Sequence, residues 1–449
     1  MLNDNLLFIR DLYSRLGVGR EASRPRNELS IFLFFISFFL YRSRRFDSLN
    51  DPLYRGFHGI ISVNNEKLFM GLIDISRAVD DELGNELLFS KAFKECLNYL
   101  FWNDPEFVRD LLEGFSEFMQ IAGEAEIAKA FDSCILEGFL PKDFSASESY
   151  TTVEAADLII SLAGLGARDS ICDITCGGGR LIFYAAWYLR SRGLQCNSME
   201  GIDVDIKKIR IAKIAAVLCG FSFIKYEVAD SLLVAQAKKY DVVLSHPPFS
   251  LANWRNSAAC HKLFEFGDPP KNNADFAFVQ ALLSSMQTAG RALILVPEGV
   301  LFRGGEEGII REKILGKRIL HSVISLPIGF LANTTIKPSI LIFKNIRCEN
   351  VLFIDAAGGR GPFKGIKNIK DISSSIIEIY EGEKNIEGVS RFVPYGEIED
   401  NSCQLGMSRY FDIDLRGRRA LKESLERQKE LELRFENLSE EFYSILEKE

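Results

Sequence analysis

The sequence predicts an α/β protein with a doubly wound, mostly parallel sheet, an all-helical N-terminal domain and a C-terminal amphipathic helix. Short apolar runs alternate with helix-length segments from Ser170 onward, which is typical of parallel sheets covered on both faces by helices. Helical spacing without strand alternation fills the first 146 residues, and apolar residues alternately four and three apart end the chain. We therefore expect a helical domain at 1–146, a sheet domain at 147–410 and a terminal helix at 411–449.

The sheet domain should contain several buried strands, separated in places by helices. The expected strands are Ser170–Asp173, Met199–Asp203, Ile224–Val228, Asp241–Ser245, Arg291–Val296, His321–Leu326, Pro338–Phe343 and the short Val351–Asp355. Helical spacing covers Ile206–Leu218 and Ala274–Met286. No convincing helix separates 321–326 from 338–343, so we expect these two strands to form an antiparallel hairpin that closes one edge of the sheet.

Composition limits the kinds of function. The 449 residues are 47% hydrophobic, enough to bury a sizeable core, and carry a net charge of -8. That charge excludes nucleic-acid binding through bulk positive charge, so any DNA contact requires a local patch or a partner. Nine cysteines, an odd number, and no expected secretory leader indicate a reduced, cytoplasmic chain. With only four histidines and no second pair beside Cys172 and Cys176, we predict no metal site.

One apolar run, Ile31–Tyr41, bears on membrane association. It is about half as long as the roughly 20 residues that cross a bilayer. A helix buried in a helical bundle is the preferred interpretation, and a membrane anchor is the alternative. We predict no membrane partner.

A glycine turn follows the first expected strand, in the sequence Asp173-Ile174-Thr175-Cys176-Gly177-Gly178-Gly179. In a doubly wound sheet, the crevice beyond the carboxyl end of this strand is the usual cofactor site, and an acid at the end of the next strand binds a ribose. Asp203 occupies that second position. A purely structural tight turn is the alternative.

The strand Asp241–Ser245 runs directly into His246-Pro247-Pro248-Phe249. The prolines end the strand and stiffen the backbone, placing a carbonyl group and an aromatic ring in the same crevice. Such a turn suits a flat base held by stacking. A strand terminator followed by a core phenylalanine is the alternative interpretation.

Together these stretches resemble the amino-methylating DNA methyltransferases, and among them the modification subunit of type I restriction systems, over about residues 149–344. The resemblance implies a Rossmann-like methyltransferase sheet and S-adenosylmethionine as cofactor. The family turn Asp-Pro-x-Cys-Gly-x-Gly stands here at 173–179, with Ile174 in place of proline. Residues that the resemblance assigns to the cofactor are Asp173, Cys176, Gly177 and Gly179 in this turn, Asp203 at the ribose, Asp230 near the adenine, and Tyr150 and Thr151 beside the methionine part.

Two further segments look typical of type I modification subunits, Phe266–Phe278 and Val296–Gly305. Leu331–Ile336 also resembles the family. The implied function is N6-adenine DNA methylation. A catalytically impaired scaffold with the same fold is the alternative, and methylation of a protein glutamine or an RNA base is a third interpretation, because a Pro-Pro-Phe turn suits any planar amide or amine.

The catalytic turn departs from the family at His246. Family members have Asn or Asp there, whose side chain accepts a hydrogen bond from the target amino group. The carbonyl of the next residue, here Pro247, accepts another, and Phe249 would stack on the base. A neutral imidazole offers one acceptor nitrogen but no carbonyl oxygen. Three interpretations of His246 are open: a substitute acceptor or base, a side chain that blocks the site in a catalytically silent relative, or a plain turn residue. Loss of a positioned polar group, such as the Asn or Asp side chain of the family, costs about 10²- to 10³-fold in rate.

The terminal stripe includes Leu431, Phe435, Leu438, Phe442 and Ile445. Packing of this helix on its own domain and packing on a specificity subunit, which the resemblance implies, both remain open. By the same resemblance the partners are double-stranded DNA with a flipped adenine, a specificity subunit and a second modification subunit, and a restriction (nuclease) subunit is a further potential partner.

Overall fold

The computed structural model describes residues 64–82, 90–91, 93–95, 97–98, 104–121, 151–218, 221–234, 238–254, 264–331, 334–366, 368–411 and 427–428. The apolar run 31–41 and Tyr150 lie outside these residues. Most of the expected terminal helix does too, although residues 427–428 are helical. Among the described residues, no helix combines the length and hydropathy needed to span a membrane.

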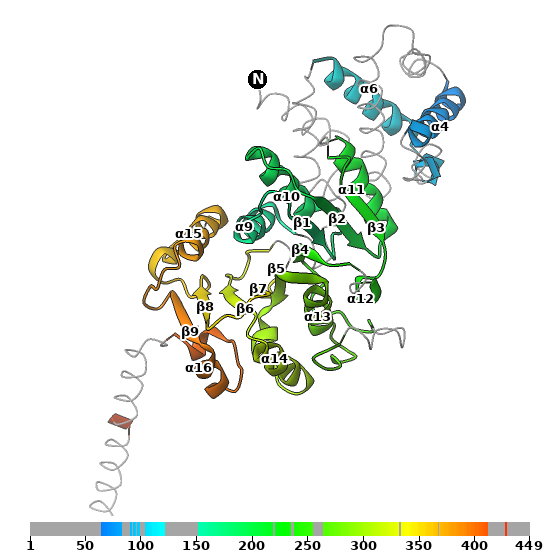
Figure 1. The fold of residues 1–449 in the computed structure, drawn as a ribbon. Coiled ribbons are helices and arrows are strands. Elements are labelled where there is room, and N and C mark those ends of the chain that lie inside the picture. The colour runs from blue at the N-terminus through cyan, green and yellow to red at the C-terminus, as the bar shows by residue number, and fades with distance from the viewer. Residues whose placement is uncertain are drawn as a thin grey trace, which may run out of the picture.

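The described part is built around one nine-stranded sheet in the order β3-β2-β1-β4-β5-β7-β6-β8-β9 (Figure 1). Strands β1 to β5 run parallel where they pair, as do β6 and β8, whereas β7 and β9 run antiparallel to their neighbours. The strands are β1 (Ser170–Asp173), β2 (Ser198–Asp203), β3 (Lys225–Val228), β4 (Tyr240–Ser245), β5 (Met286–Pro297), β6 (Leu320–Ser325), β7 (Pro338–Lys344), β8 (Asn350–Asp355) and β9 (Ser390–Pro394).

Helices pack on both faces of this sheet, and further described helices, among them α4 (Asn65–Glu82) and α6 (Pro105–Ile121), lie beyond it (Figure 1). They are followed in the chain by α9 (Val153–Ala163), α10 (Arg180–Ser191), α11 (Ile206–Leu218), α12 (Ser231–Val234), α13 (Asp275–Ser285), α14 (Glu306–Gly316), α15 (Ile369–Glu381) and α16 (Tyr395–Asp400), with short 3-10 turns at Glu298–Leu301, Gly361–Phe363 and Met407–Arg409.

Alternate residues of the central strands enter two separate buried clusters. Val242 and Leu244 of β4 pack with α9, α10, α11 and α15, whereas Val243 between them packs with α13 and α14. Because successive side chains of a strand point to opposite faces, a strand buried on both faces reads as a continuous apolar run. The predicted doubly wound architecture is therefore confirmed.

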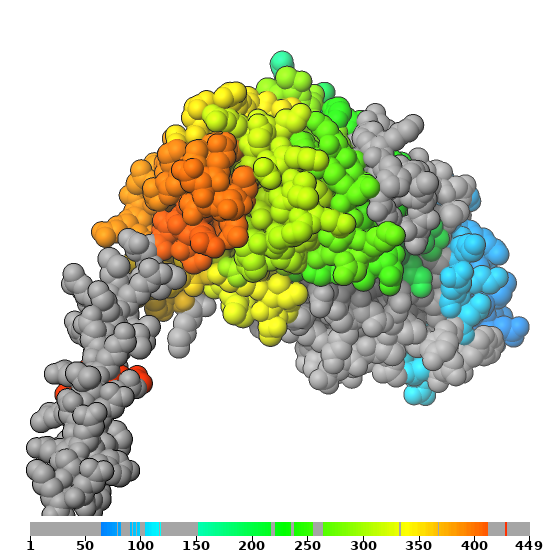
Figure 2. All heavy atoms as spheres, turned by 90° about the horizontal axis from the view of Figure 1, so that it is seen from below, coloured from blue at the N-terminus to red at the C-terminus, as the bar shows by residue number. Residues whose placement is uncertain are grey.

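The predicted antiparallel hairpin exists, but its predicted position at the sheet edge is wrong. Strand β7 inserts between β5 and β6, and β8 pairs in parallel with β6, followed by β9 at the edge. Strand β8 is apolar on both faces, from Val351 to Ile354, and therefore needs neighbours that cover it. Figure 2 shows β9 and α16 in orange at one end of the surface and α4 and α6 in blue and cyan at the other.

Helix α9 is capped at its N-terminus. The Thr152 hydroxyl accepts a hydrogen bond from the Ala155 N–H at 3.2 Å and so caps the first turn. At the other end, Gly164 adopts a left-handed conformation, and Arg291 on β5 donates to its carbonyl at 2.9 Å. Both ends of α9 are therefore fixed, and with them Thr151, which directly precedes the cap.

Candidate functional site

Three adjacent strands end at the same edge of the sheet. Strand β1 lies between β2 and β4, with Asp173 opposite Gly201 on one side and Leu244 on the other. Because all three strands run parallel, the glycine turn after β1, Asp203 at the end of β2 and His246 after β4 meet at this edge. The three sequence features used to predict a site are thus brought together.

The glycine turn is held by backbone hydrogen bonds. The Cys176 N–H donates to the Ile202 carbonyl at 2.9 Å, and the Gly179 N–H donates to the Cys176 carbonyl at 2.7 Å. Gly179 has φ +89°, and a Cβ there would lie 3.0 Å from the Phe183 ring. At Gly178, by contrast, a Cβ would meet no atom within 4 Å. The turn therefore packs inward through Gly179 and leaves space beside Gly178.

Two half-exposed carboxylates lie at the ends of β2 and β3. Asp203 accepts hydrogen bonds from the backbone N–H groups of Gly177 at 2.8 Å and Asp205 at 2.9 Å. Asp230 accepts from the Leu232 N–H at 2.9 Å. Next to Asp203 in sequence, Val204 is 72% exposed. An adenosine has a diol that needs acceptors and a flat base that needs apolar contact, so an acid, an exposed apolar side chain and open glycine backbone fit such a group.

Asp173 and Cys176 are buried parts of the same turn. The pKa of Asp173 is raised to about 8, mainly by burial and to a smaller extent by the nearby negative charge of Asp203. The Thr175 N–H, which donates to the Asp173 carboxylate at 3.1 Å, partly opposes this rise. The Cys176 side chain is 6% exposed, and a Cβ on Gly201 would lie 3.0 Å from its sulfur. The Cys176 thiol thus fills space between β1 and β2.

The turn after β4 is connected to the glycine turn by hydroxyl groups. The His246 N–H donates to the Thr175 hydroxyl at 3.1 Å, and that hydroxyl also bonds the Ser245 hydroxyl at 2.8 Å. On the side chain, His246 Nδ1 lies 2.8 Å from the Thr151 hydroxyl. Burial lowers the pKa of His246 to about 3, so its imidazole is neutral near pH 7.

Two aromatic rings lie together in this turn. The centroids of His246 and Phe249 are 5.5 Å apart, with an angle of 52° between the ring planes. Both residues are buried, at 2% and 3% exposure. A base can therefore contact either ring only after the residues that cover them move aside.

A buried carboxylate supports the residues directly after Phe249. Asp275, at the start of α13, accepts the Ser250 N–H at 2.8 Å and also binds the guanidinium of Arg303, which in turn binds Glu307. Asp275 belongs to the segment 266–278, and Arg303 belongs to 296–305. The two segments that look typical of type I modification subunits thus meet behind the proposed catalytic turn.

Sequence reasoning missed Thr175, Asp275 and Arg303 as parts of the site. Thr175 was within the quoted turn, and a hydroxyl directly after a buried strand end is a signal that could have drawn attention to it. Asp275 and Arg303 carry no comparable local signal. Of the predicted site residues, Tyr150 alone lies outside the described part of the chain.

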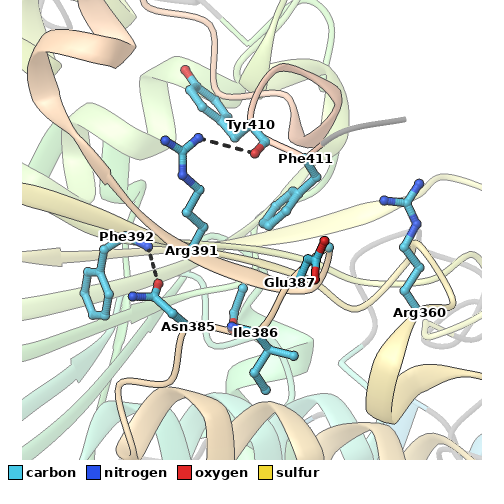
Figure 3. Close-up of a pocket in the computed structure, with 10 residues that line it drawn as sticks. Arg360, Asn385, Ile386, Glu387, Arg391, Phe392, Tyr410 and Phe411 are labelled. Atoms are coloured by element: carbon cyan, nitrogen blue, oxygen red, sulfur yellow. Dashed lines mark hydrogen bonds between the residues drawn. The ribbon is translucent and has the colours of Figure 1, made fainter. Parts of the chain in front are cut away.

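A separate cavity of about 810 Å³ lies near β9 (Figure 3). Arg391 in its wall makes two hydrogen bonds to Glu397, at 2.8 and 2.7 Å, and a longer one to the Tyr410 carbonyl at 3.5 Å. Phe392 and Asn385 bond to each other at 3.0 Å. Arg391 is therefore engaged within the protein. The cavity wall contains neither the glycine turn nor the turn after β4, so we retain the sheet edge as the candidate site.

Comparisons with known proteins match most of the chain that the structure describes. A family model described as N-6 DNA Methylase matches residues 133–416, more than half of the chain. The MjaVII type I restriction enzyme methylase subunit of Methanocaldococcus jannaschii is 26% identical over 335 residues, covering 70% of this chain and 58% of the relative. The MjaVIII methylase subunit from the same organism is 28% identical over 313 residues, covering 62% and 53%. The chain thus spans somewhat more than half the length of these relatives.

Among solved structures, the type I restriction-modification system methyltransferase subunit from Streptococcus thermophilus has a similar fold. The TM-score is 0.73 at 22% identity, covering 92% of this chain and all of the other. At this identity the likeness concerns the fold.

Proposed function

Because this chain belongs to the N-6 DNA methylase family, we propose that it is the modification subunit of a type I restriction-modification system. In this proposal it transfers a methyl group from S-adenosylmethionine to the N6 amino group of adenine in DNA. One observation carries the proposal: the Thr175 hydroxyl connects the glycine turn to the turn that contains His246 and Phe249. A cofactor in the first turn and a base at the second would be adjacent.

The residues at the edge divide into those that would hold each part of the cofactor. Asp203 would accept hydrogen bonds from the ribose, and Asp230 with the exposed Val204 would flank the adenine. The open backbone at Gly177 and Gly178 allows close approach. Thr151, Asp173 and the turn at Cys176 would lie along the methionine part, together with Tyr150. When bound, the cofactor supplies an electrophilic methyl group on a positively charged sulfur.

The chain itself must activate the target nitrogen. The lone pair of an adenine amino group is delocalised into the ring, so the group is a poor nucleophile. Hydrogen bonds from the amino group to His246 Nε2 and to the Pro247 carbonyl would draw it toward tetrahedral geometry and free the pair. Phe249 would hold the base by stacking, and Pro248 keeps the turn rigid.

The low pKa of His246 limits its role as a base. With a pKa near 3, the imidazole is too weak to remove a proton from a neutral amino group. We therefore assign His246 as a hydrogen-bond acceptor during methyl transfer. The surplus proton passes to solvent water only afterwards, when the methylated nitrogen carries positive charge and is strongly acidic.

DNA binding would require partners. A chain with net charge -8 attracts duplex DNA poorly. A specificity subunit and a second modification subunit would provide the rest of the DNA-binding surface, and a restriction subunit would join the same assembly. We propose that this assembly acts in the cytoplasm. Within it, the terminal helix at 411–449 would pack against the specificity subunit. The other two proposed domains are residues 1–146 and 147–410.

The test is transfer of radiolabelled methyl groups by the full chain, co-purified with its specificity subunit, beside the His246→Asn variant. Duplex DNA, RNA and protein are offered separately, and the DNA product is identified as N6-methyladenine by mass spectrometry. Transfer to DNA by the unmodified chain supports the proposal. Transfer by His246→Asn alone identifies a catalytically impaired scaffold, and label in RNA or protein alone overturns the choice of substrate. If neither form transfers label while both bind the cofactor, the proposed activity is rejected.

A further inference from the structure

The contact between Thr151 and His246 joins two segments that are 95 residues apart in the chain. The Thr151 hydroxyl lies 2.8 Å from His246 Nδ1, and both residues are buried, at 9% and 2% exposure. A hydroxyl can either donate to a ring nitrogen or accept from it. The direction of this one hydrogen bond therefore decides which ring nitrogen carries the proton.

The imidazole has one proton to place. Burial lowers the pKa of His246 to about 3, so the neutral ring carries hydrogen on either Nδ1 or Nε2. Nε2 is buried and has no hydrogen-bond partner among the residues that the structure describes. If Thr151 donated to Nδ1, the ring proton would sit on Nε2 as a buried N–H without an acceptor. If Nδ1 donates to Thr151, Nε2 carries only a lone pair.

The second arrangement leaves the hydrogen of the Thr151 hydroxyl to be placed instead, but this hydrogen can rotate and belongs to the more exposed residue, at 9% against 2%. It therefore costs less than an Nε2–H that is fixed in the plane of a buried ring. We propose that Thr151 is a positioning residue: it accepts the Nδ1 proton of His246 and so keeps Nε2 bare, as the acceptor for the amino group of the target base. The role of Nε2 toward the target base rests on the proposed function. The hydrogen bond between Thr151 and His246 does not depend on it.

Thr151 is well placed for this task because its backbone is fixed. Thr152 caps α9, and α9 packs against α10 and α15. At the far end of α9, Arg291 donates to the Gly164 carbonyl. Asparagine in the same position as His246 would need no such help, since its amide oxygen is always an acceptor. The requirement for Thr151 is therefore specific to a chain with histidine in the turn.

The first test is NMR of the full chain labelled with ¹⁵N-histidine. The chain has four histidines, and the signals that disappear in His246→Asn identify those of His246. We expect a protonated Nδ1 and an unprotonated Nε2, retained in Thr151→Ser and lost in Thr151→Val, which has the same shape without the hydroxyl. A protonated Nε2 in the unmodified chain, or an unchanged ring in Thr151→Val, would overturn the inference whatever the activity.

The second test separates positioning from cofactor binding. Thr151→Val should lower kcat for methyl transfer by about 10- to 100-fold, and Thr151→Ser should restore most of it. In the His246→Asn background, Thr151→Val should lower kcat by a clearly smaller factor than in the unmodified chain, because asparagine has no ring tautomer for Thr151 to select and only a contact with the cofactor could still be lost. An equal loss in both backgrounds would instead assign Thr151 to the cofactor alone. If no variant transfers methyl groups, the proposed function fails, and the NMR result alone decides whether Thr151 orders His246.

Discussion

The carboxylate of Asp203 accepts a hydrogen bond from the backbone N–H of Gly177 at 2.8 Å, across 26 residues. Its other oxygen accepts the Asp205 N–H at 2.9 Å. The acid that ends β2 therefore holds the glycine turn that follows β1. The same carboxylate is half-exposed, which leaves it accessible to a ligand.

Replacing Asp203 should weaken cofactor binding in two steps. Asp203→Asn keeps an acceptor for Gly177 but loses the charge, whereas Asp203→Ala loses both. We expect the dissociation constant of S-adenosylmethionine to rise about 10-fold in the first and about 100-fold in the second, since a hydrogen bond to a charged group contributes about 1.5 to 3 kcal/mol. Isothermal titration calorimetry measures both. Asp205→Asn is the matched control, and an equal loss there would show that only the backbone nearby had been disturbed.

Asp173 should make stability depend on pH. Its pKa is about 8 in the folded protein, against 3.8 for the ordinary carboxyl, so the folded state holds the proton more tightly between these values. The stabilisation is complete below pH 4 and is lost as pH rises through 8, at up to about 1.4 kcal/mol per pH unit. Asp173→Asn removes this contribution while keeping an oxygen for the Thr175 N–H. Relative to the unmodified chain, this variant should therefore gain stability between pH 5 and 8 in urea unfolding.

The exposed Glu227 provides the comparison for that experiment. Glu227 is exposed on β3, so Glu227→Gln makes the same change from carboxyl to amide without altering the buried turn. If the free energy of unfolding varied with pH in the same way for Asp173→Asn and the unmodified chain, Asp173 would be ionised in the folded protein.

Arg303 should contribute more to stability than its partial exposure indicates. Its partner Asp275 is 1% exposed, so Arg303→Met leaves a buried carboxylate without a counter-charge. We expect a loss of about 3 kcal/mol in the free energy of unfolding. Part of this should return in the double variant with Asp275→Asn, because the buried side chain is then neutral. A loss below about 1 kcal/mol, as for an exposed ion pair, would contradict this view.

A surface ion pair on the same domain calibrates this measurement. Lys317 and Glu265 are 2.7 Å apart, with side chains 54% and 66% exposed. Lys317→Met should therefore cost less than about 1 kcal/mol.

Alanine should affect stability at Gly179 and cofactor binding at Gly178. Gly179→Ala places a Cβ 3.0 Å from the Phe183 ring at φ +89° and should cost about 2 kcal/mol in stability. Gly178→Ala meets no atom of the protein within 4 Å and should change stability by less than about 1 kcal/mol. The added methyl group would nevertheless occupy the space assigned to the cofactor. Thermal unfolding and calorimetric binding should thus separate the two variants, and normal cofactor affinity in Gly178→Ala would move the cofactor site elsewhere.

The central strands could be predicted from sequence because burial on both faces gives continuous apolar runs. Strand β1 starts and ends as predicted, and β2, β4 and β7 do so within one residue. Strand β9 was not predicted: Arg391 and Pro394 interrupt its apolar pattern, as suits a strand at an edge. Strand β5 starts at Met286, five residues early, because Met286 pairs with Tyr240 before the register shifts between Tyr240 and Val242 of β4.

Site residues could be predicted from sequence only where a polar or titratable side chain stands at the end of a strand or directly after it. Asp173, Asp203 and His246 each stand at such a position, so topology alone brings them to one edge. The contact from Asp275 to Ser250 depends instead on the path of the chain between them. Many side chains could serve as the acceptor for a given backbone N–H, and only the folded backbone selects one.

The outermost strands of the described sheet have one more consequence, for solubility. An edge strand offers unpaired N–H and C=O groups to any other chain, and is a starting point for aggregation. On β3, Lys225 and Glu227 are exposed, and on β9, Arg391 and Pro394 are exposed. A foreign strand docking there would have to bury charges, and at Pro394 it would find no N–H to pair with. Both outermost strands of the described sheet thus carry residues that oppose pairing with another strand.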